Sequence, residues 1–187
     1  MKRLSIYFYQ KSTLILSIII SVAVFFYMYF IMMESGKCFE IEGHEINSLG
    51  LSFGFSYEVV ENFFSIRSKE MLTCFRDFNL IWDSIFCLLY GLMYMIWISF
   101  LFKAYSTKLK MLNLLPLLQT IFDWLENSQL ESISNTVLLD TNISEFTVSL
   151  ASIFSIAKWI VAGLVFIIVL IGIGIKIKDY FSKNGLN

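Results

Sequence analysis

The residues of this sequence that could do chemistry lie close together inside an apolar stretch. Asp123 and Glu126 are three positions apart, and Asn127 follows Asp123 by four. On a helix these side chains share one face, with Gln119 one turn earlier. Such a polar stripe within an apolar helix fits an ion or proton path, a lipid-headgroup site, or an interhelical clamp that only fixes packing.

Lys158, in the next apolar stretch, is the expected partner of this stripe. Asp123 and Lys158 each lie ten residues from the same end of their stretches, about 15 Å along a helix. A charge facing lipid costs about 2.5–3.5 kcal/mol on insertion scales. We therefore expect Asp123, Glu126 and Asn127 to face the protein interior, and Lys158 to approach Asp123. One acid is left over, and it would be protonated, meet a second partner such as Gln119, or meet water.

The composition indicates which elements carry these residues. The chain of 187 residues is 57% hydrophobic and only 16% charged, against about 45–50% and about 25% in soluble domains. A helix needs about 20 apolar residues to cross a membrane. The sequence predicts a single all-α domain over residues 1–187, a bundle of four transmembrane helices at about 12–33, 80–102, 111–133 and 148–175. Asp83 lies about one turn inside the second span, so we expect it to reach the membrane interface.

The basic residues predict the orientation. Nine of the fourteen Lys and Arg residues lie before the first span, between the second and third, and after the fourth. The positive-inside rule then places both termini in the cytoplasm of a bacterium, with the chain in the inner membrane. The basic segments all lie on one side of the membrane only if the third span crosses it. The net charge of −1 and the absence of a dense basic block argue against direct nucleic-acid binding.

The segment 34–79 is predicted to lie outside the membrane and to contain an amphipathic helix. Ser56 has the character of a helix N-cap, followed by Glu58 and Glu61 and by apolar residues at mostly helical spacing up to Phe75. Such a helix would rest on the outer bilayer face or cap the bundle. It would be either a sensing surface or a simple connector.

The three cysteines predict a disulfide. Cys38 and Cys74 both lie in the outer segment, where the compartment is oxidising, whereas Cys87 lies within the second span. No metal site or cofactor is expected, because there is no C-x-x-C and the single histidine, His44, has no companion at ligand spacing. Glycine-rich phosphate loops and G-x-S-x-G elbows are also missing from the sequence.

Two resemblances follow from these residues. The run LNLLPLLQTIFDWLEN, with Pro116, Asp123, Glu126 and Asn127, resembles the third helix of small bacterial four-helix membrane proteins of unassigned function. The stretch from Phe55 to Gly91 is similar to the family's preceding segment, with Ile66-Arg67 where the family often has Gly-Arg. This resemblance covers about residues 50–130 and implies the four-helix fold without an activity. In size, spans and composition, the chain also resembles the membrane subunit of the Kiwa antiphage system, which implies an oligomeric sensor with a cytoplasmic partner.

The favoured function is therefore a non-enzymatic membrane component, an oligomeric sensor or anchor of a larger system, with antiviral defence as one possible role. A small ion or proton channel or carrier that uses Asp123, Glu126 and Lys158 is the first alternative. A lipid-modifying enzyme that uses the same carboxylates is the second. A homo-oligomer is expected because small residues of the fourth span, Ala151, Ser155 and Gly163, permit close helix approach.

Overall fold

A computed structural model describes residues 1–43 and 48–183, and His44 lies outside them. The described residues are helical or irregular and contain no strand, so the all-α prediction is confirmed. Three helices are long and apolar enough to cross a membrane, over Leu14–Phe39, Lys69–Leu101 and Glu145–Ser182. They correspond to the predicted first, second and fourth spans.

Two of these three helices are built from several helical segments joined end to end. The first consists of α2 (Leu14–Tyr27), a π-turn (Met28–Met32), α3 (Met33–Gly36) and a 3₁₀ turn (Lys37–Phe39). The second consists of α5 (Lys69–Asp77), a π-turn (Phe78–Asp83) and α6 (Ser84–Leu101). The third is α8 (Glu145–Lys183), whose 39 residues extend over about 58 Å, well beyond a bilayer core of about 30 Å.

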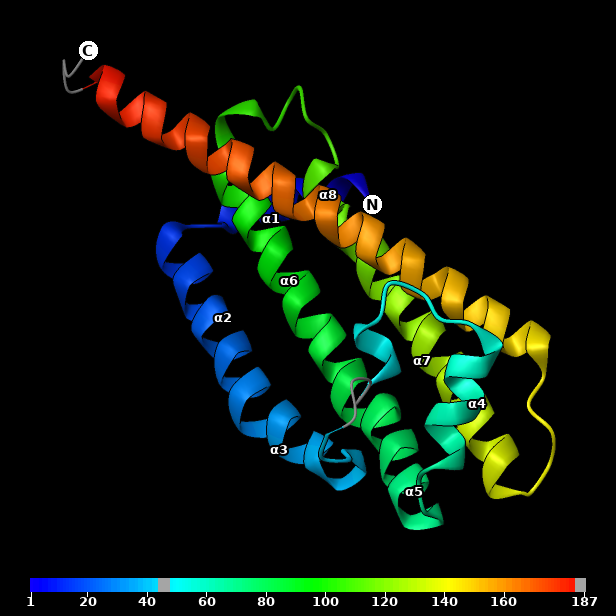
Figure 1. Cartoon of the computed structure of the whole chain (residues 1–187). Coiled ribbons are helices and arrows are strands. Elements are labelled where there is room, and N and C mark those ends of the chain that lie inside the picture. The colour runs from blue at the N-terminus through cyan, green and yellow to red at the C-terminus, as the bar shows by residue number, and fades with distance from the viewer. Residues whose placement is uncertain (44–47, 184–187) are drawn as a thin grey trace.

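The predicted third span corresponds to α7 (Pro116–Leu138), which begins with proline at its first turn. Its 23 residues cover about 35 Å, which is long enough to cross a membrane. It contains acidic residues and is not among the three helices that are apolar enough to cross. The helix lies between α6 and α8 and buries its polar stripe against them. Figure 1 shows α2, α6, α7 and α8 alternating in direction, with the N-terminus, the 102–115 connection and the end of α8 toward the same end.

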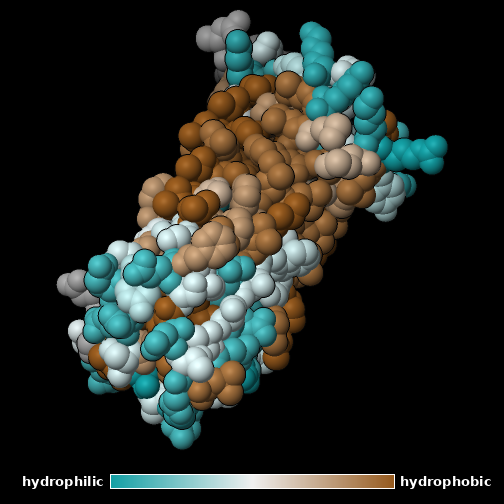
Figure 2. All heavy atoms as spheres, turned by 90° about the vertical axis from the view of Figure 1, so that its right-hand side faces the viewer, coloured by the Kyte–Doolittle hydropathy of each residue, from teal (hydrophilic) through white to brown (hydrophobic). Residues whose placement is uncertain are grey.

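The surface has a belt of apolar residues between two hydrophilic ends. Figure 2 shows this brown belt on one face, with the larger hydrophilic part at the end that holds α4, α5 and the end of α7. Along α2, side chains such as Ile15, Val22 and Phe25 are more than half exposed. Apolar side chains exposed at this density are typical of helices in contact with lipid.

A helix at the N-terminus, α1 (Lys2–Lys11), was not predicted. It packs against the 102–115 connection, where the Ser5 hydroxyl donates to Asn113 Oδ1 at 2.6 Å and the Tyr9 hydroxyl donates to the carbonyl of Leu109 at 2.9 Å. Asn113 is fully buried and also donates to the Ser99 hydroxyl at 2.8 Å. These long-range contacts have no sequence periodicity that would have disclosed them.

The amphipathic helix predicted in segment 34–79 is two helices, α4 (Tyr57–Ser65) and α5. Ser56 caps α4 by accepting from the N–H of Val59, and Ser68 caps α5 by accepting from the N–H of Met71. The second cap starts a new helix where the sequence suggested a continuous one. Neither helix has its apolar face free to rest on a bilayer, because both bury it within the protein.

These faces form what we call the distal core, a cluster of buried side chains from segment 34–79 and from the adjoining ends of α7 and α8. Phe75 is fully buried, and its ring lies 5.1, 4.8 and 5.9 Å from those of Phe39, Phe63 and Phe64. The other members are Leu49, Val60, Leu72, Phe78, Leu130, Ile133, Val148 and Ala151. Segment 34–79 therefore caps the bundle, one of the two predicted arrangements.

The small residues of α8 serve packing within the chain. Ala151 is buried in the distal core, and the buried Ser155 donates its hydroxyl to the carbonyl of Ser52 at 2.7 Å. The Ala151-x-x-x-Ser155 pair is therefore not a free face for a second copy. A homo-oligomer stays a prediction, supported now only by Gly163, around which a Cβ would meet no described atom within 4 Å.

Candidate functional site

The site is a group of charged and polar side chains from three helices, which we call the polar cluster. It consists of Asp123, Glu126, Asn127 and Lys158, which are buried, and of Asp83, which is half-buried. Lys158 on α8 faces α7, and its Nζ lies 3.2 Å from Asp123 Oδ1 and 2.5 Å from Glu126 Oε2. Glu126 has no exposed surface, and Asp123 and Lys158 are 5% and 6% exposed. The one ammonium group thus lies between two carboxylates of the same helix face.

Lys158 also contacts the segment that precedes α4. Its ammonium donates to the carbonyl oxygen of Gly50 at 2.8 Å, in the 3₁₀ turn Leu49–Leu51. Next to it, the N–H of Phe55 donates to the Ser152 hydroxyl at 2.9 Å. The chain between the distal core and α4 therefore reaches down to the polar cluster and binds the same lysine as the acids of α7.

Tyr90 completes the environment of Asp123. Its hydroxyl donates to Asp123 Oδ2 at 2.6 Å, so both oxygens of this carboxylate have a donor. The helices α6 and α7 can approach here because Gly91 lies against Thr120, where a Cβ would collide with Thr120 Oγ1. Sequence reasoning placed Tyr90 and Gly91 within a resemblance but assigned them no role.

Asp83 is half-buried and lies beside the buried acids of the cluster, and its position relative to the membrane interface stays a prediction. Its Oδ2 accepts from the amide nitrogen of Asn127 at 2.8 Å. The other amide atom, Asn127 Oδ1, is buried and has no hydrogen-bond partner among the described residues. The π-turn Phe78–Asp83 ends at Asp83, and such turns often occur at functional sites because they redirect a side chain.

Gln119 is buried but stays outside the cluster. Its side chain is 8% exposed, and within the described residues no hydrogen bond joins it to Asp123. The sequence left one acid without a partner once Lys158 paired with Asp123. In the structure this second acid, Glu126, also pairs with Lys158, and it has no other ion pair in the part of the chain described.

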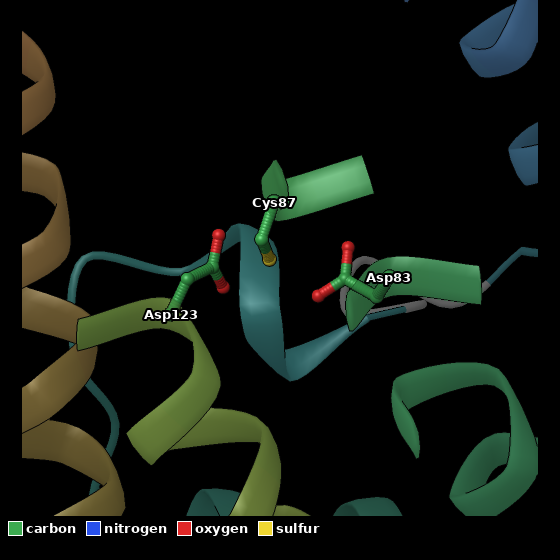
Figure 3. Close-up of side chains that lie close together, drawn as sticks. All are labelled: Asp83, Cys87 and Asp123. Atoms are coloured by element: carbon green, nitrogen blue, oxygen red, sulfur yellow. The ribbon is translucent and has the colours of Figure 1, made fainter. Parts of the chain in front are cut away.

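A second combination of side chains was missed from the sequence. Asp83, Cys87 and Asp123 each offer one ligand atom, and these atoms all lie within 4.8 Å of one another. Figure 3 shows the two carboxylates pointing toward each other, with the Cys87 sulfur between them. Asp83 and Cys87 are four positions apart and so share a helix face, and this spacing is the part of the combination that the sequence could have indicated. Asp123 comes from another helix, which no local spacing reveals.

In segment 34–79, Cys38 and Cys74 form a disulfide with their Cα atoms 6.3 Å apart. The buried guanidinium of Arg67 lies above the Phe63 ring and donates to the carbonyls of Phe39 and Phe63 at 2.9 and 2.7 Å. Burial lowers the pKa of Arg67, although a guanidinium remains protonated in proteins. Disulfide and guanidinium together join the start of the segment to α4 and α5.

Comparisons with protein-family models, with curated proteins and with solved structures find no match for this chain.

Proposed function

We propose that this chain is a non-enzymatic membrane protein that crosses a bacterial inner membrane four times and transmits changes in its outer segment to the membrane interior. Support for the fourth crossing comes from α7, which is long enough to cross, runs antiparallel to α6 and α8, and buries its acids against them. Crossing by α7 gathers the basic segments at one end, which the positive-inside rule makes cytoplasmic. Segment 34–79 is then periplasmic, where a disulfide is stable.

The contact of Lys158 with Gly50 carries this proposal. One ammonium group holds a carbonyl of the outer segment and two carboxylates of a membrane helix. A ligand or partner that moves the 49–51 turn removes an acceptor from Lys158 and changes how α7 and α8 are held together. An oligomeric sensor or anchor with a cytoplasmic partner, as in the Kiwa resemblance, is the system in which such coupling would be used.

Topology is tested first, with reporter fusions after residue 140 and after residue 187. A periplasmic reporter should be active only in the first fusion. Activity after residue 187 with none after residue 140 would overturn the orientation.

Coupling is tested by hydrogen exchange in nanodiscs. An impermeant reductant opens the Cys38–Cys74 disulfide, and exchange is then compared across the chain. We expect faster exchange in segment 34–79 and in residues 103–122, beyond the cluster. In Lys158→Met, the reductant should act on segment 34–79 alone. Changes confined to that segment in the wild type would refute the coupling.

A second function, a proton or cation carrier, is favoured by one specific observation. The cluster holds three carboxylates, those of Asp83, Asp123 and Glu126, but one ammonium group, which pairs with Asp123 and Glu126, so protons or a cation would supply the missing positive charge. Flux across liposomes that contain the purified protein would support this function if Asp123→Asn combined with Lys158→Met folds and abolishes it. Absence of flux in the wild type would exclude it.

A further inference from the structure

The starting point is the charge of the polar cluster. Asp83 and Asp123 point toward each other across the Cys87 sulfur (Figure 3), and Lys158 forms an ion pair with Asp123 but none with Asp83 among the described residues. Like charges at this separation repel strongly in a medium of low dielectric constant. A cation between the two carboxylates removes this repulsion, and a sulfur beside them favours a soft one.

A fourth ligand lies next to the other three. The Asn127 side chain is 3% exposed, and its amide contacts Asp83, yet its Oδ1 has no hydrogen-bond partner among the described residues. Turning the amide about its last bond brings this oxygen to the position of the nitrogen, 2.8 Å from Asp83 Oδ2. Two oxygens this close are stable only with a proton or a cation beside them. The amide nitrogen thus occupies the place beside Asp83 that a fourth ligand oxygen would take.

A groove of about 530 Å³ lies beside this space, between the second apolar helix and α7. On α7 its lining includes Asn127, Ser128 and Glu131, the last one turn nearer the predicted outer end. Trp124 also lines the groove, and its indole N–H donates to the carbonyl of Ser84 at 3.0 Å. The opposite side is lined by the apolar side chains of Leu80, Ile81, Ile85 and Leu88, which are 40–50% exposed, so Ser128 and Glu131 offer a cation the polar side of the groove.

We propose that Asp83, Cys87, Asp123 and Asn127 form a binding site for a soft divalent cation of the zinc class. Zinc is bound by cysteine sulfur and by carboxylate oxygen in four-coordinate sites, with bonds of about 2.0–2.3 Å. The ligand atoms of Asp83, Cys87 and Asp123 already lie within 4.8 Å of one another, so small movements of these side chains would bring them around such an ion. Coordination by sulfur displaces the thiol proton to solvent, so the step is a ligand exchange without oxidation or reduction.

The site is independent of the proposed signalling role, since cation binding requires none of the outer contacts of Lys158. Tyr90 and Lys158 would remain on Asp123 and keep its carboxylate oriented, as outer hydrogen bonds do for metal ligands.

The test uses Co²⁺ as a spectroscopic probe. The full-length protein is purified in nanodiscs with its disulfide intact, stripped with a chelator and titrated with Co²⁺. Because Cys38 and Cys74 are bonded to each other, Cys87 is the only free thiol of the three cysteines. We expect a thiolate-to-cobalt charge-transfer band in the near ultraviolet, one cobalt per chain at saturation, and displacement by Zn²⁺.

Three variants attribute the signal to the site. Cys87→Ser should lose the band, and Asp83→Asn should weaken binding by at least about tenfold. Asp140→Asn is the matched control, because its carboxylate is exposed and distant in sequence from the cluster; it should bind as the wild type does. Folding of each variant is checked by circular dichroism and by elution volume.

Three results would overturn the proposal. The first is the absence of stoichiometric cobalt binding in the wild type, which leaves protons as the neutralising charge. The second is a band that survives Cys87→Ser. The third is binding without the band that is still lost in Asp83→Asn, which would be an oxygen-only cation site.

Discussion

The distal core and the polar cluster hold the same two helices together by opposite means. In the distal core, α7 and α8 meet segment 34–79 through phenylalanine rings and aliphatic side chains. In the polar cluster, less than three turns away along α7, they meet through carboxylates and an ammonium group. The difference is the one expected if the distal core is surrounded by water and the polar cluster by lipid. Apolar burial stabilises only where water is the alternative, whereas between helices in lipid it contributes little and polar contacts specify the packing.

This contrast gives independent physical support for the predicted border of the membrane. A segment lying in lipid would gain nothing from gathering Phe39, Phe63 and Phe75 in its interior. The distal core therefore fits an aqueous compartment, and the exposed charges of Lys37 and Lys69 around it agree. The two regions meet where Gly50, next to Leu49 of the distal core, accepts from Lys158.

The largest effect is expected from Lys158→Met. The change leaves two buried carboxylates without their ammonium partner, at a cost of about 3–5 kcal/mol unless they take up protons. Thermal denaturation in nanodiscs and expression level measure the loss.

A second substitution in the Lys158→Met background shows which acid is the principal partner of Lys158, because removing that acid restores the most stability. Asp123 keeps the hydrogen bond from Tyr90, whereas Glu126 has no other ion pair among the described residues. In the Lys158→Met background, Glu126→Gln should therefore recover more stability than Asp123→Asn. The reverse order would contradict the assignment of Glu126.

Phe75→Ala should cost nearly as much, about 3–5 kcal/mol for an aromatic side chain removed from a packed core. Phe75 is fully buried and contacts three other rings. The loss should be confined to segment 34–79, which limited proteolysis and hydrogen exchange can resolve. Phe53→Ala is the matched control, because this ring is 66% exposed. An equal loss of melting temperature in both variants would mean that the distal core is not a packed unit.

Composition and hydrophobicity predicted the three helices that are apolar along most of their length. The spans around Val22, Ile96 and Leu164 are apolar over many residues, so their existence does not depend on their neighbours. The facing of Asp123 and Lys158 was also predictable, because the cost of charge in lipid leaves few alternatives.

The remaining features depend on contacts between distant residues. The break between α4 and α5 lies at the Ser68 cap, and next to it the Arg67 guanidinium donates to the carbonyl of Phe39, which is distant in the sequence. Likewise, Gly50 is one loop residue among many until α8 places Lys158 beside it. Such tertiary partners leave no periodicity in the sequence.

A smaller effect is expected from removing the disulfide with Cys38→Ser and Cys74→Ser together. The bridge spans 36 residues, and bridges of this kind typically stabilise by about 2–4 kcal/mol through the unfolded chain. The distal core should melt at lower temperature and lose most of its protection from hydrogen exchange, while the loss transmitted through the polar cluster to residues 103–122 should be smaller. Equal loss of protection in both regions would show that they form one cooperative unit.

The smallest effect is expected from Tyr90→Phe, which removes one hydroxyl from the polar cluster and leaves packing unchanged. Hydrogen bonds between membrane helices average about 0.6 kcal/mol, with a maximum near 1.7 kcal/mol. This donor lies 2.6 Å from a carboxylate oxygen, so a loss in the upper part of that range is expected. Tyr94→Phe is the matched control, since its hydroxyl forms no hydrogen bond within the described part of the chain and its side chain lies one turn further along α6. The comparison is made sharper by repeating Tyr90→Phe in the Asp123→Asn background, where the acceptor is neutral and the loss should shrink. An undiminished loss there would mean that Tyr90 stabilises the helices by packing, as the distal core does, and not by binding the Asp123 carboxylate.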